Sequence, residues 1–298
     1  MTRDRVTRWR GRTSRHGPRF RHPVTPSPRH PVTPSSFLRR RGVTLLELLT
    51  AMTIMVMVIG ALGGITKAVQ LSFEYNQGHG DATQHARVVL ERICRTARDA
   101  TANETFPGLV VLAEEAGSWR FPDTLLVWHP DGDPVSPDGS PRLDELVIYC
   151  PNANAPGTLV EITTSDTAEL SEDEATRAAQ IEAIKRSNTS DVTTLTSLLR
   201  TGAVDDGGGG ELRGAVRFET LLRPSEAGWK DTSIAWEDLP WVQGIYGSGT
   251  GLRQAWVRIE IQLMTGDPPA AGAVDRRQAI PFFGSAALYY TMRAEQRP

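Results

Sequence analysis

The sequence predicts an α+β protein in which a long N-terminal helix, membrane-spanning in its first half, packs on an antiparallel β-sheet head with a small helical insertion. An apolar run over residues 43–66, followed by a helical periodicity to about residue 100, predicts the helix. Beyond Thr101, short apolar runs separated by Pro, Gly and Asp predict strands joined by turns. We expect four parts: a disordered leader (1–42), an apolar helix (43–66), an amphipathic stalk helix (67–102) and a β-rich head (103–298).

Charge is distributed unevenly along the 298 residues, although the formal net charge is only -2. Residues 1–42 contain 12 Arg and one Asp, a net charge of +11, whereas the rest contains 21 basic and 34 acidic residues, a net charge of −13. A basic terminal segment binds nucleic acid or fixes the orientation of a membrane span. An acidic head does not favour contact with a phosphate backbone, so we expect no nucleic-acid partner.

The first 42 residues are rich in Arg, Pro, Ser and His and contain the heptapeptide RHPVTPS twice. Such a segment has almost no apolar surface to bury, so we expect it to be disordered. Two interpretations remain open. The segment is a basic cytoplasmic leader, or the gene start is over-extended and only FLRRRG, at residues 37–42, forms the leader.

The apolar run from Val43 to Thr66 contains 24 residues and one ionisable group, Glu47. A helix of this length spans about 36 Å, which exceeds the roughly 30 Å hydrocarbon core of a bilayer. The three arginines before it, at 39–41, predict a cytoplasmic N-terminus and a head across the membrane. A secretory signal peptide is disfavoured, because its apolar stretch is usually about 7–15 residues and carries no carboxylate.

Glu47 is the most informative residue of this run. A carboxylate in lipid costs about 2.5–3.5 kcal/mol even on mild scales, which makes it a functional candidate. It needs a cation at the same depth, and Lys67 lies 20 residues further along the chain. The nearest candidate is the α-amino group that cleavage between Gly42 and Val43 would create, one helical turn away.

The run RRRG followed by VTLLELLTAM resembles the N-terminal signal of prepilins and pseudopilins, the subunits of type IV pili and type II secretion pseudopili. The resemblance implies that prepilin peptidase cleaves after Gly42 and methylates Val43, which stands where the family usually has Phe. It places Glu47 at the fifth mature position, where it would contact the terminal ammonium of an adjacent subunit. It also implies a helix breaker at Gly64.

Within this family, the size of the chain and the presence of Glu47 resemble minor pseudopilin J or minor pilin W. The implied partners are prepilin peptidase, other pilin or pseudopilin subunits, the inner-membrane assembly platform and the lipid bilayer. The implied location is the inner membrane, as a single-pass protein with a periplasmic head, and then the filament. One alternative stays open: a membrane-anchored periplasmic binding module or hydrolase that does not polymerise.

The apolar residues of the stalk recur with the period of a helix, and those of the head with the period of a strand. In the stalk, five small or β-branched residues recur at spacings of three and four and predict a buried stripe: Ala82, Ala86, Val89, Ile93 and Ala97. In the head, residues 256–261 alternate between polar and apolar side chains, as in a sheet with one wet face. The predicted strands are Gly108–Leu112, Thr124–His129, Glu145–Cys150, Thr158–Thr163, Ala215–Leu221, Ala255–Leu263 and Ile280–Phe283.

A polar insertion at residues 165–210 separates the predicted strands. Ser171 and Glu174 predict a capping box that opens a helix ending near Arg186. A second short helix is expected at Asp191–Arg200, and Asp205–Gly210 reads as a flexible linker. The insertion is either a surface for a partner or a solvated elaboration.

Other candidate sites are weaker. Asp131, Asp133 and Asp138 lie in DGDPVSPDG, which is a weak calcium candidate and equally ordinary turn chemistry. Cys94 and Cys150 form either a disulfide or two buried free thiols. We find no spacing typical of a nucleophile with its base or of a phosphate-binding loop, so the sequence predicts no enzyme and no cofactor beyond the calcium candidate.

Overall fold

The computed structural model describes residues 43–116, 118–204, 211–233, 235–238, 250–265 and 279–293. The chain divides into two units, 1–60 and 61–298, which are described separately. The first contributes the beginning of helix α1 (Leu45–Arg98), and the second contains the rest of α1 and the head. The expected disordered leader at 1–42 and the linker at 205–210 lie outside the described residues.

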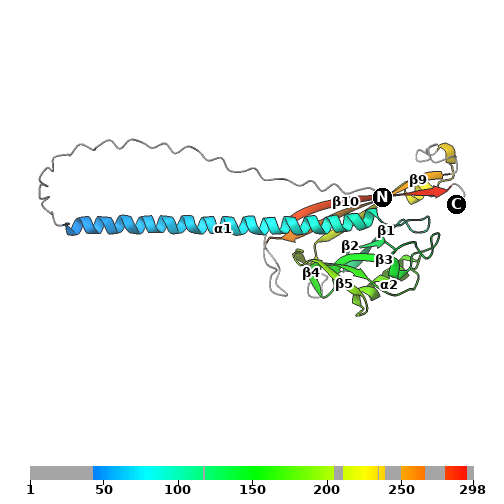
Figure 1. The fold of residues 1–298 in the computed structure, drawn as a ribbon, viewed down its shortest axis with the longest axis horizontal. Coiled ribbons are helices and arrows are strands. Elements are labelled where there is room, and N and C mark those ends of the chain that lie inside the picture. The colour runs from blue at the N-terminus through cyan, green and yellow to red at the C-terminus, as the bar shows by residue number, and fades with distance from the viewer. Residues whose placement is uncertain are drawn as a thin grey trace, which may run out of the picture. The chain divides into compact units, whose positions relative to one another are not determined.

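Helix α1 is one continuous helix of 54 residues (Figure 1). Thr44 precedes it and its hydroxyl accepts a hydrogen bond from the backbone N–H of Glu47 at 3.3 Å. Arg95 and Arg98 lie in the last turn, where cations are favoured by the helix dipole. The expected breaker at Gly64 is wrong, since the helix continues through it; an interior glycine costs only about 1 kcal/mol, which the other helix-forming residues offset.

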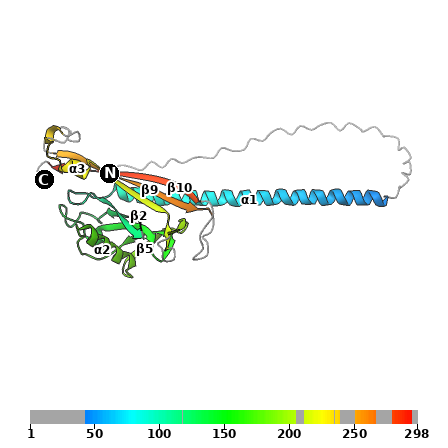
Figure 2. The ribbon, with the colours of Figure 1, turned by 180° about the vertical axis from the view of Figure 1, so that it is seen from behind.

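The described residues of the head form three antiparallel sheets, of five, three and two strands; the five-stranded sheet and strands β9 and β10 are labelled in Figures 1 and 2. The strands in their sheet order are β1 (Leu109–Ala116), β2 (Trp119–Trp128), β3 (Leu146–Asn152), β4 (Ala155–Thr163) and β5 (Asp191–Thr196); β10 (Ala279–Arg293), β9 (Thr250–Met264) and β8 (Val216–Arg223); and β6 (Thr201–Val204) with β7 (Glu211–Gly214). The short helices are α2 (Glu174–Arg186), α3 (Glu226–Lys230) and the 3-10 turns Leu143–Glu145 and Trp236–Asp238.

The α+β class and all seven predicted strands are confirmed, with β9 and β10 each extended to 15 residues. The helix expected at Asp191–Arg200 is wrong, because residues 191–196 form β5, the fifth strand of the large sheet. Val192 and its neighbouring threonines favour the extended backbone and pair with β4. The capping box at Ser171 is also wrong: α2 begins at Glu174, and the carboxylate of Asp173 accepts from the N–H of Thr176 at 2.8 Å.

The five-stranded sheet separates two hydrophobic cores. Leu125 and Val127 of β2 belong to a core shared with the second half of α1, whereas Leu126 and Trp128 belong to a core shared with α2. This alternation follows from the two-residue period of a strand. The predicted stripe of α1 is buried in the first core, and that stripe is therefore confirmed.

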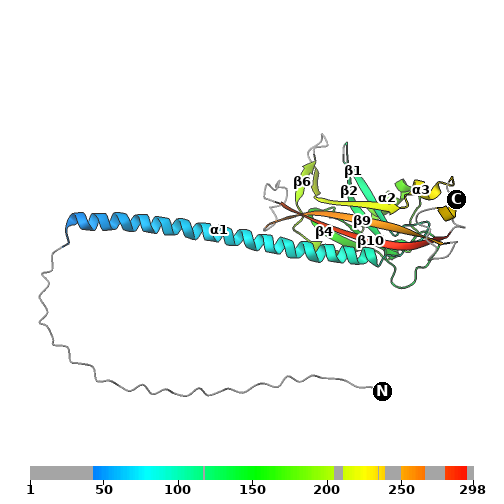
Figure 3. The same ribbon diagram turned by 90° about the horizontal axis from the view of Figure 1, so that it is seen from above.

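Two kinds of contact fix the second half of α1 on the sheets (Figure 3). Strand β10 approaches the helix closely at Gly284, where an added Cβ would lie 3.0 Å from a methyl group of Leu90. On the other sheet, the guanidinium of Arg92 donates two hydrogen bonds to Glu161 of β4, at 2.6 and 2.7 Å. This bidentate pair lowers the pKa of Glu161 and raises that of Arg92.

Truncation of Ile93 tests this packing. Ile93 is fully buried, so Ile93→Ala should lower the free energy of unfolding of the head by about 2–5 kcal/mol. Ile54→Ala, the same change at a residue of α1 that is 62% exposed, is the control and should leave head stability unchanged. The measurement is urea unfolding of the full chain in detergent micelles, followed by tryptophan fluorescence; equal effects of the two variants would contradict this packing.

Candidate functional site

The first half of α1 presents an apolar surface on all sides. Every described residue from 43 to 77 is exposed, including Leu45 at 79% and Phe73 at 66%. An 18-residue window of this helix has a mean hydropathy of 2.2, and none of it is buried. The helix is therefore long and apolar enough to cross a membrane.

The threonine hydroxyls within the apolar part of this helix are satisfied locally. The hydroxyls of Thr53 and Thr66 donate to the carbonyls of Leu49 and Leu62, each at 2.9 Å. The hydroxyl of Thr50 lies within 3.1 Å of the carbonyls one turn before it. Such bonds remove the penalty of a hydroxyl in a medium without water, so the threonines do not disqualify the span.

Glu47 is the exception. It lies in the first turn of α1, with its backbone N–H bound to the Thr44 hydroxyl. Among the described residues, no side chain forms an ion pair or hydrogen bond with its carboxylate. Val43, one turn before it, is 71% exposed. The structure thus places two predicted site residues, Val43 and Glu47, at the start of the helix; Gly42 lies outside the described part.

The weak calcium candidates do not come together. Asp131, Asp133 and Asp138 are each exposed in the loop between β2 and β3. In the part of the chain that the structure describes, no three His, Cys, Asp or Glu side chains are grouped to hold a metal ion.

The two cysteines are free and buried, so the disulfide alternative is not observed. Cys94 belongs to the core on the α1 side of the five-stranded sheet, and Cys150 to the core on the α2 side. Cys94 donates a weak hydrogen bond to the carbonyl of Ser285 at 3.5 Å. Burial raises the pKa of Cys150 to about 12, which makes it an unreactive thiol at neutral pH.

A cluster of charges that the sequence did not indicate joins four elements of the head. Glu114 of β1 accepts from Lys185 of α2 at 2.5 Å and from Arg213 of β7 at 2.7 Å. Asp123 of β2 is 5% exposed, with its carboxylate 3.5 Å from the same arginine and 3.2 Å from the Thr124 hydroxyl. The cluster lies at a groove of about 1370 Å³ bounded by β1, β2, α2 and β7.

The two carboxylates of this cluster have opposite pKa shifts. Burial raises the pKa of Asp123, and the negative charge of Glu114 raises it further, to about 6. Burial also acts on Glu114, but hydrogen bonds and charges from Lys185 and Arg213 outweigh it and lower its pKa to about 2. Glu114 is therefore the ionised partner of the two cations, and Asp123 is the group that titrates near neutral pH.

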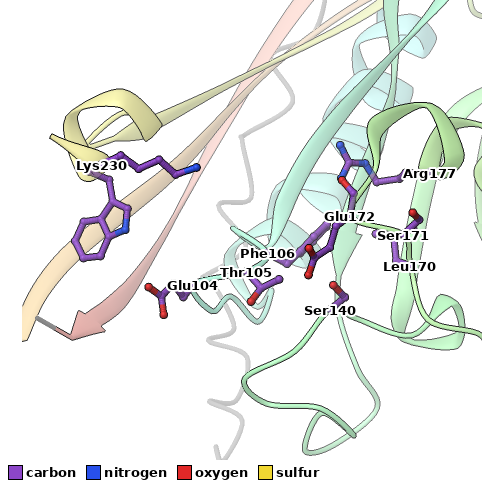
Figure 4. A pocket seen from close by; sticks show the side chains of 10 residues that line it. Glu104, Thr105, Phe106, Ser140, Leu170, Ser171, Glu172, Arg177 and Lys230 are labelled. Carbon is purple, nitrogen blue, oxygen red and sulfur yellow. The ribbon is translucent and has the colours of Figure 1, made fainter. Parts of the chain in front are cut away.

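A smaller cleft, of about 410 Å³, lies between the segment at 104–106, the start of the α2 region and α3 (Figure 4). Its lining combines the carboxylates of Glu104 and Glu172 with the cations of Arg177 and Lys230. Burial raises the pKa of Glu104, against the charge of Arg253. Among the described residues that line it there is no His or Cys, and so no thiol nucleophile or imidazole base.

Comparison with known proteins identifies the N-terminal segment. The family model described as the prokaryotic N-terminal methylation motif matches residues 38–63, which include Gly42, Val43 and Glu47. Neither the curated proteins nor the solved structures gave a match. The chain is thus prepilin-like: it carries the N-terminal methylation motif, which implies processing by a prepilin peptidase, on a long apolar helix that continues onto an antiparallel β-sheet head.

Asp123→Asn tests the charge cluster. The folded-state pKa of Asp123, about 6, lies above the ordinary value of an aspartate, 3.8, so its contribution to stability is present in acid and is lost as the pH rises through 6. Relative to the wild type, the variant should gain about 1–2 kcal/mol between pH 5 and pH 7.5.

The measurement is chemical unfolding at the two pH values. Asp131→Asn removes an exposed aspartate and is the matched control, for which no pH-dependent gain is expected. A gain for Asp123→Asn that is the same at both pH values would show that titration of this carboxyl is not its cause.

Proposed function

We propose that this protein is a minor pilin-like subunit of a type II secretion pseudopilus or a type IV pilus. In this proposal, prepilin peptidase cleaves the chain between Gly42 and Val43 and methylates the new terminus, and the subunit assembles through α1. The observation that carries the proposal is the exposed apolar half of α1, which directly follows the cleavage site of the matched motif.

The physical argument begins with the cost of exposure. Full burial of a Leu, Ile, Val or Met side chain stabilises a structure by about 1.5–3 kcal/mol, and α1 exposes more than a dozen such side chains before residue 77. In the monomer, a bilayer would bury these side chains. In a filament, a bundle of neighbouring helices would bury them. A helix of this kind can therefore move from the membrane into a filament without exposing its apolar surface to water.

Glu47 supports assembly rather than simple anchoring. Its carboxylate has no partner among the described residues, and cleavage before Val43 supplies an ammonium one turn away. In the monomer the two groups can pair within one chain. In the filament, the carboxylate would pair with the terminus of an adjacent subunit, and this desolvated contact would favour one axial register.

The location and the minor role follow from charge and size. Arg39–Arg41 before the span favour a cytoplasmic N-terminus, an inner-membrane anchor and a head on the far side of the membrane. A head that occupies 103–298 would hinder repeated stacking along a filament, which favours a subunit at or near the tip. In this proposal the head has a structural role and the partners are other subunits and the assembly platform.

The mature N-terminus tests the processing step. Mass spectrometry of the protein purified from native membranes should give a first residue Val43 that carries one N-methyl group. A chain that retains residues 39–42, or that begins C-terminal to the apolar span, would instead support a membrane-anchored module that does not polymerise.

Glu47→Val tests the assembly step. Cleavage should remain intact, because the residues at the cut are unchanged, but incorporation into filaments should fall by about tenfold or more, since one desolvated ion pair is lost. The readout is the fraction of the subunit in sheared filaments when variant and wild type are co-expressed. Glu74→Gln, a change at an exposed glutamate later in the same helix, is the control; equal incorporation of Glu47→Val and wild type would refute the role of Glu47.

A further inference from the structure

Strands β6 (Thr201–Val204) and β7 (Glu211–Gly214) form a two-stranded sheet of their own, separate from the two larger sheets of the described head. None of the residues in these two strands is buried. A two-stranded pair alone is at best marginally stable in water. The position of the β6–β7 pair on the head therefore depends on the contacts that it makes with other elements.

The base of the β6–β7 pair is fixed by close backbone contacts with β4. The N–H of Leu199 donates to the carbonyl of Gly157 at 2.9 Å. Gly214 lies so close to β4 that an added Cβ would be 2.4 Å from the carbonyl oxygen of Pro156. In the described chain, every ion pair between these two strands and another element is made by Arg213. This one side chain is thus the charged connection between the pair and the rest of the head.

Arg213 contacts two carboxylates of different elements. Its Nη1 lies 2.7 Å from Glu114 of β1 and 3.5 Å from Asp123 of β2, while its Nη2 lies 3.3 Å from Glu211 of its own strand pair. The side chains of Arg213 and Asp123 are 12% and 7% exposed. Since the pKa of Glu114 is about 2 and that of Asp123 about 6, Asp123 is the partner whose charge changes near neutral pH.

Four elements bring a titratable or charged group towards Asp123: Glu114 from β1, Lys185 from α2, Arg213 from β7 and the thiol of Cys150 from β3. The thiol is uncharged, because burial raises the pKa of Cys150 to about 12. Only Arg213 belongs to the β6–β7 pair. Its positive charge lowers the pKa of Asp123, whereas burial and the charge of Glu114 raise it.

We propose that Arg213 and Asp123 form a pH-dependent latch, which holds the β6–β7 pair on β1 and β2 when Asp123 is ionised and loosens when this carboxyl is protonated. The sign follows from linkage: docking of Arg213 lowers the pKa of Asp123, so docking is strengthened above pH 6 and weakened as the pH falls through 6. Glu114 keeps its contact with Arg213 in acid, so the pair loosens without detaching. Loosening widens access to the groove of about 1370 Å³ bounded by β1, β2, α2 and β7.

The latch and the whole fold respond to pH in opposite directions. Global unfolding relieves the burial of Asp123 and the repulsion from Glu114, so ionisation of Asp123 favours it. Local opening of the β6–β7 pair removes the attraction of Arg213, so ionisation of Asp123 opposes it. Local and global opening are measured separately by hydrogen exchange. This inference concerns the head alone and does not depend on cleavage at Gly42 or on assembly through α1.

The test is hydrogen exchange of the full chain in detergent micelles at pH 5 and pH 7.5, with each rate corrected for the intrinsic exchange rate at that pH. The protection of backbone amides within 201–204 and 211–214 should rise by about threefold from pH 5 to pH 7.5, as expected for one partly exposed ion pair. In Asp123→Asn, the protection of the same amides should not change with pH.

Variants at two arginines sharpen the test. Arg213→Gln should lower the protection of the β6–β7 amides at both pH values and remove its pH dependence. Arg213→Lys keeps the charge and should retain a smaller pH dependence, which keeps the test informative where the Gln variant does not fold. Arg217→Gln is the matched control, at an arginine of β8 that is 59% exposed and paired with Glu219; it should behave as the wild type. Thermal unfolding establishes that each variant is folded.

Three results would overturn the proposal. The first is protection of the β6–β7 amides that is equal at the two pH values in the wild type. The second is protection that falls from pH 5 to pH 7.5, because burial of Asp123 rather than its attraction to Arg213 would then control the pair. The third is a pH dependence that persists in Asp123→Asn, because another group would then be its source.

Discussion

The apolar half of α1, which nothing in the described chain covers, is the constraint on which the rest depends. A helix with leucine, isoleucine and methionine exposed on every side has no stable place in water. It requires either lipid or other apolar helices, and both are environments in which a lone carboxylate is costly. Glu47 lies in the first turn of this helix. Under the proposed function, its carboxylate gives this end of the span a preference for a positively charged neighbour, which apolar residues alone cannot provide.

From Ala82 onward, the same helix packs against the head. There one face carries small and β-branched residues that are buried against the sheets. On β10, the absence of a side chain at Gly284 leaves room for Leu90 and Cys94 of the helix. Apolar contact is non-directional, so it does not by itself fix how the helix is oriented on the sheet. The bidentate ion pair between Arg92 and Glu161 adds a directional contact. Helix α1 thus has two parts. The first carries bulky apolar residues on all sides and requires contacts with other molecules. The second carries small residues on one face and packs on the head.

The features that could be predicted from the sequence are those encoded by residues close together in the chain. The methylation motif holds Gly42, Val43 and Glu47 within six residues, and helix and strand periods are local, so these could be recognised. The error at 191–200 has a physical cause: the segment has no helical period, and only pairing with β4 determines that it is a strand. The contact between Glu114 and Arg213 joins residues 99 positions apart and leaves no spacing signal, so only the fold reveals it.

The head buries most of its large apolar side chains within itself, whereas the first half of α1 leaves its own exposed. Both faces of the five-stranded sheet are covered, by α1 on one side and α2 on the other, and β1 lies against β8 and β9. Contacts of the exposed half of α1 are dominated by apolar burial, so they depend little on ionic strength. Under the proposed function, this helix can therefore exchange lipid for neighbouring helices while the internal packing of the head stays unchanged.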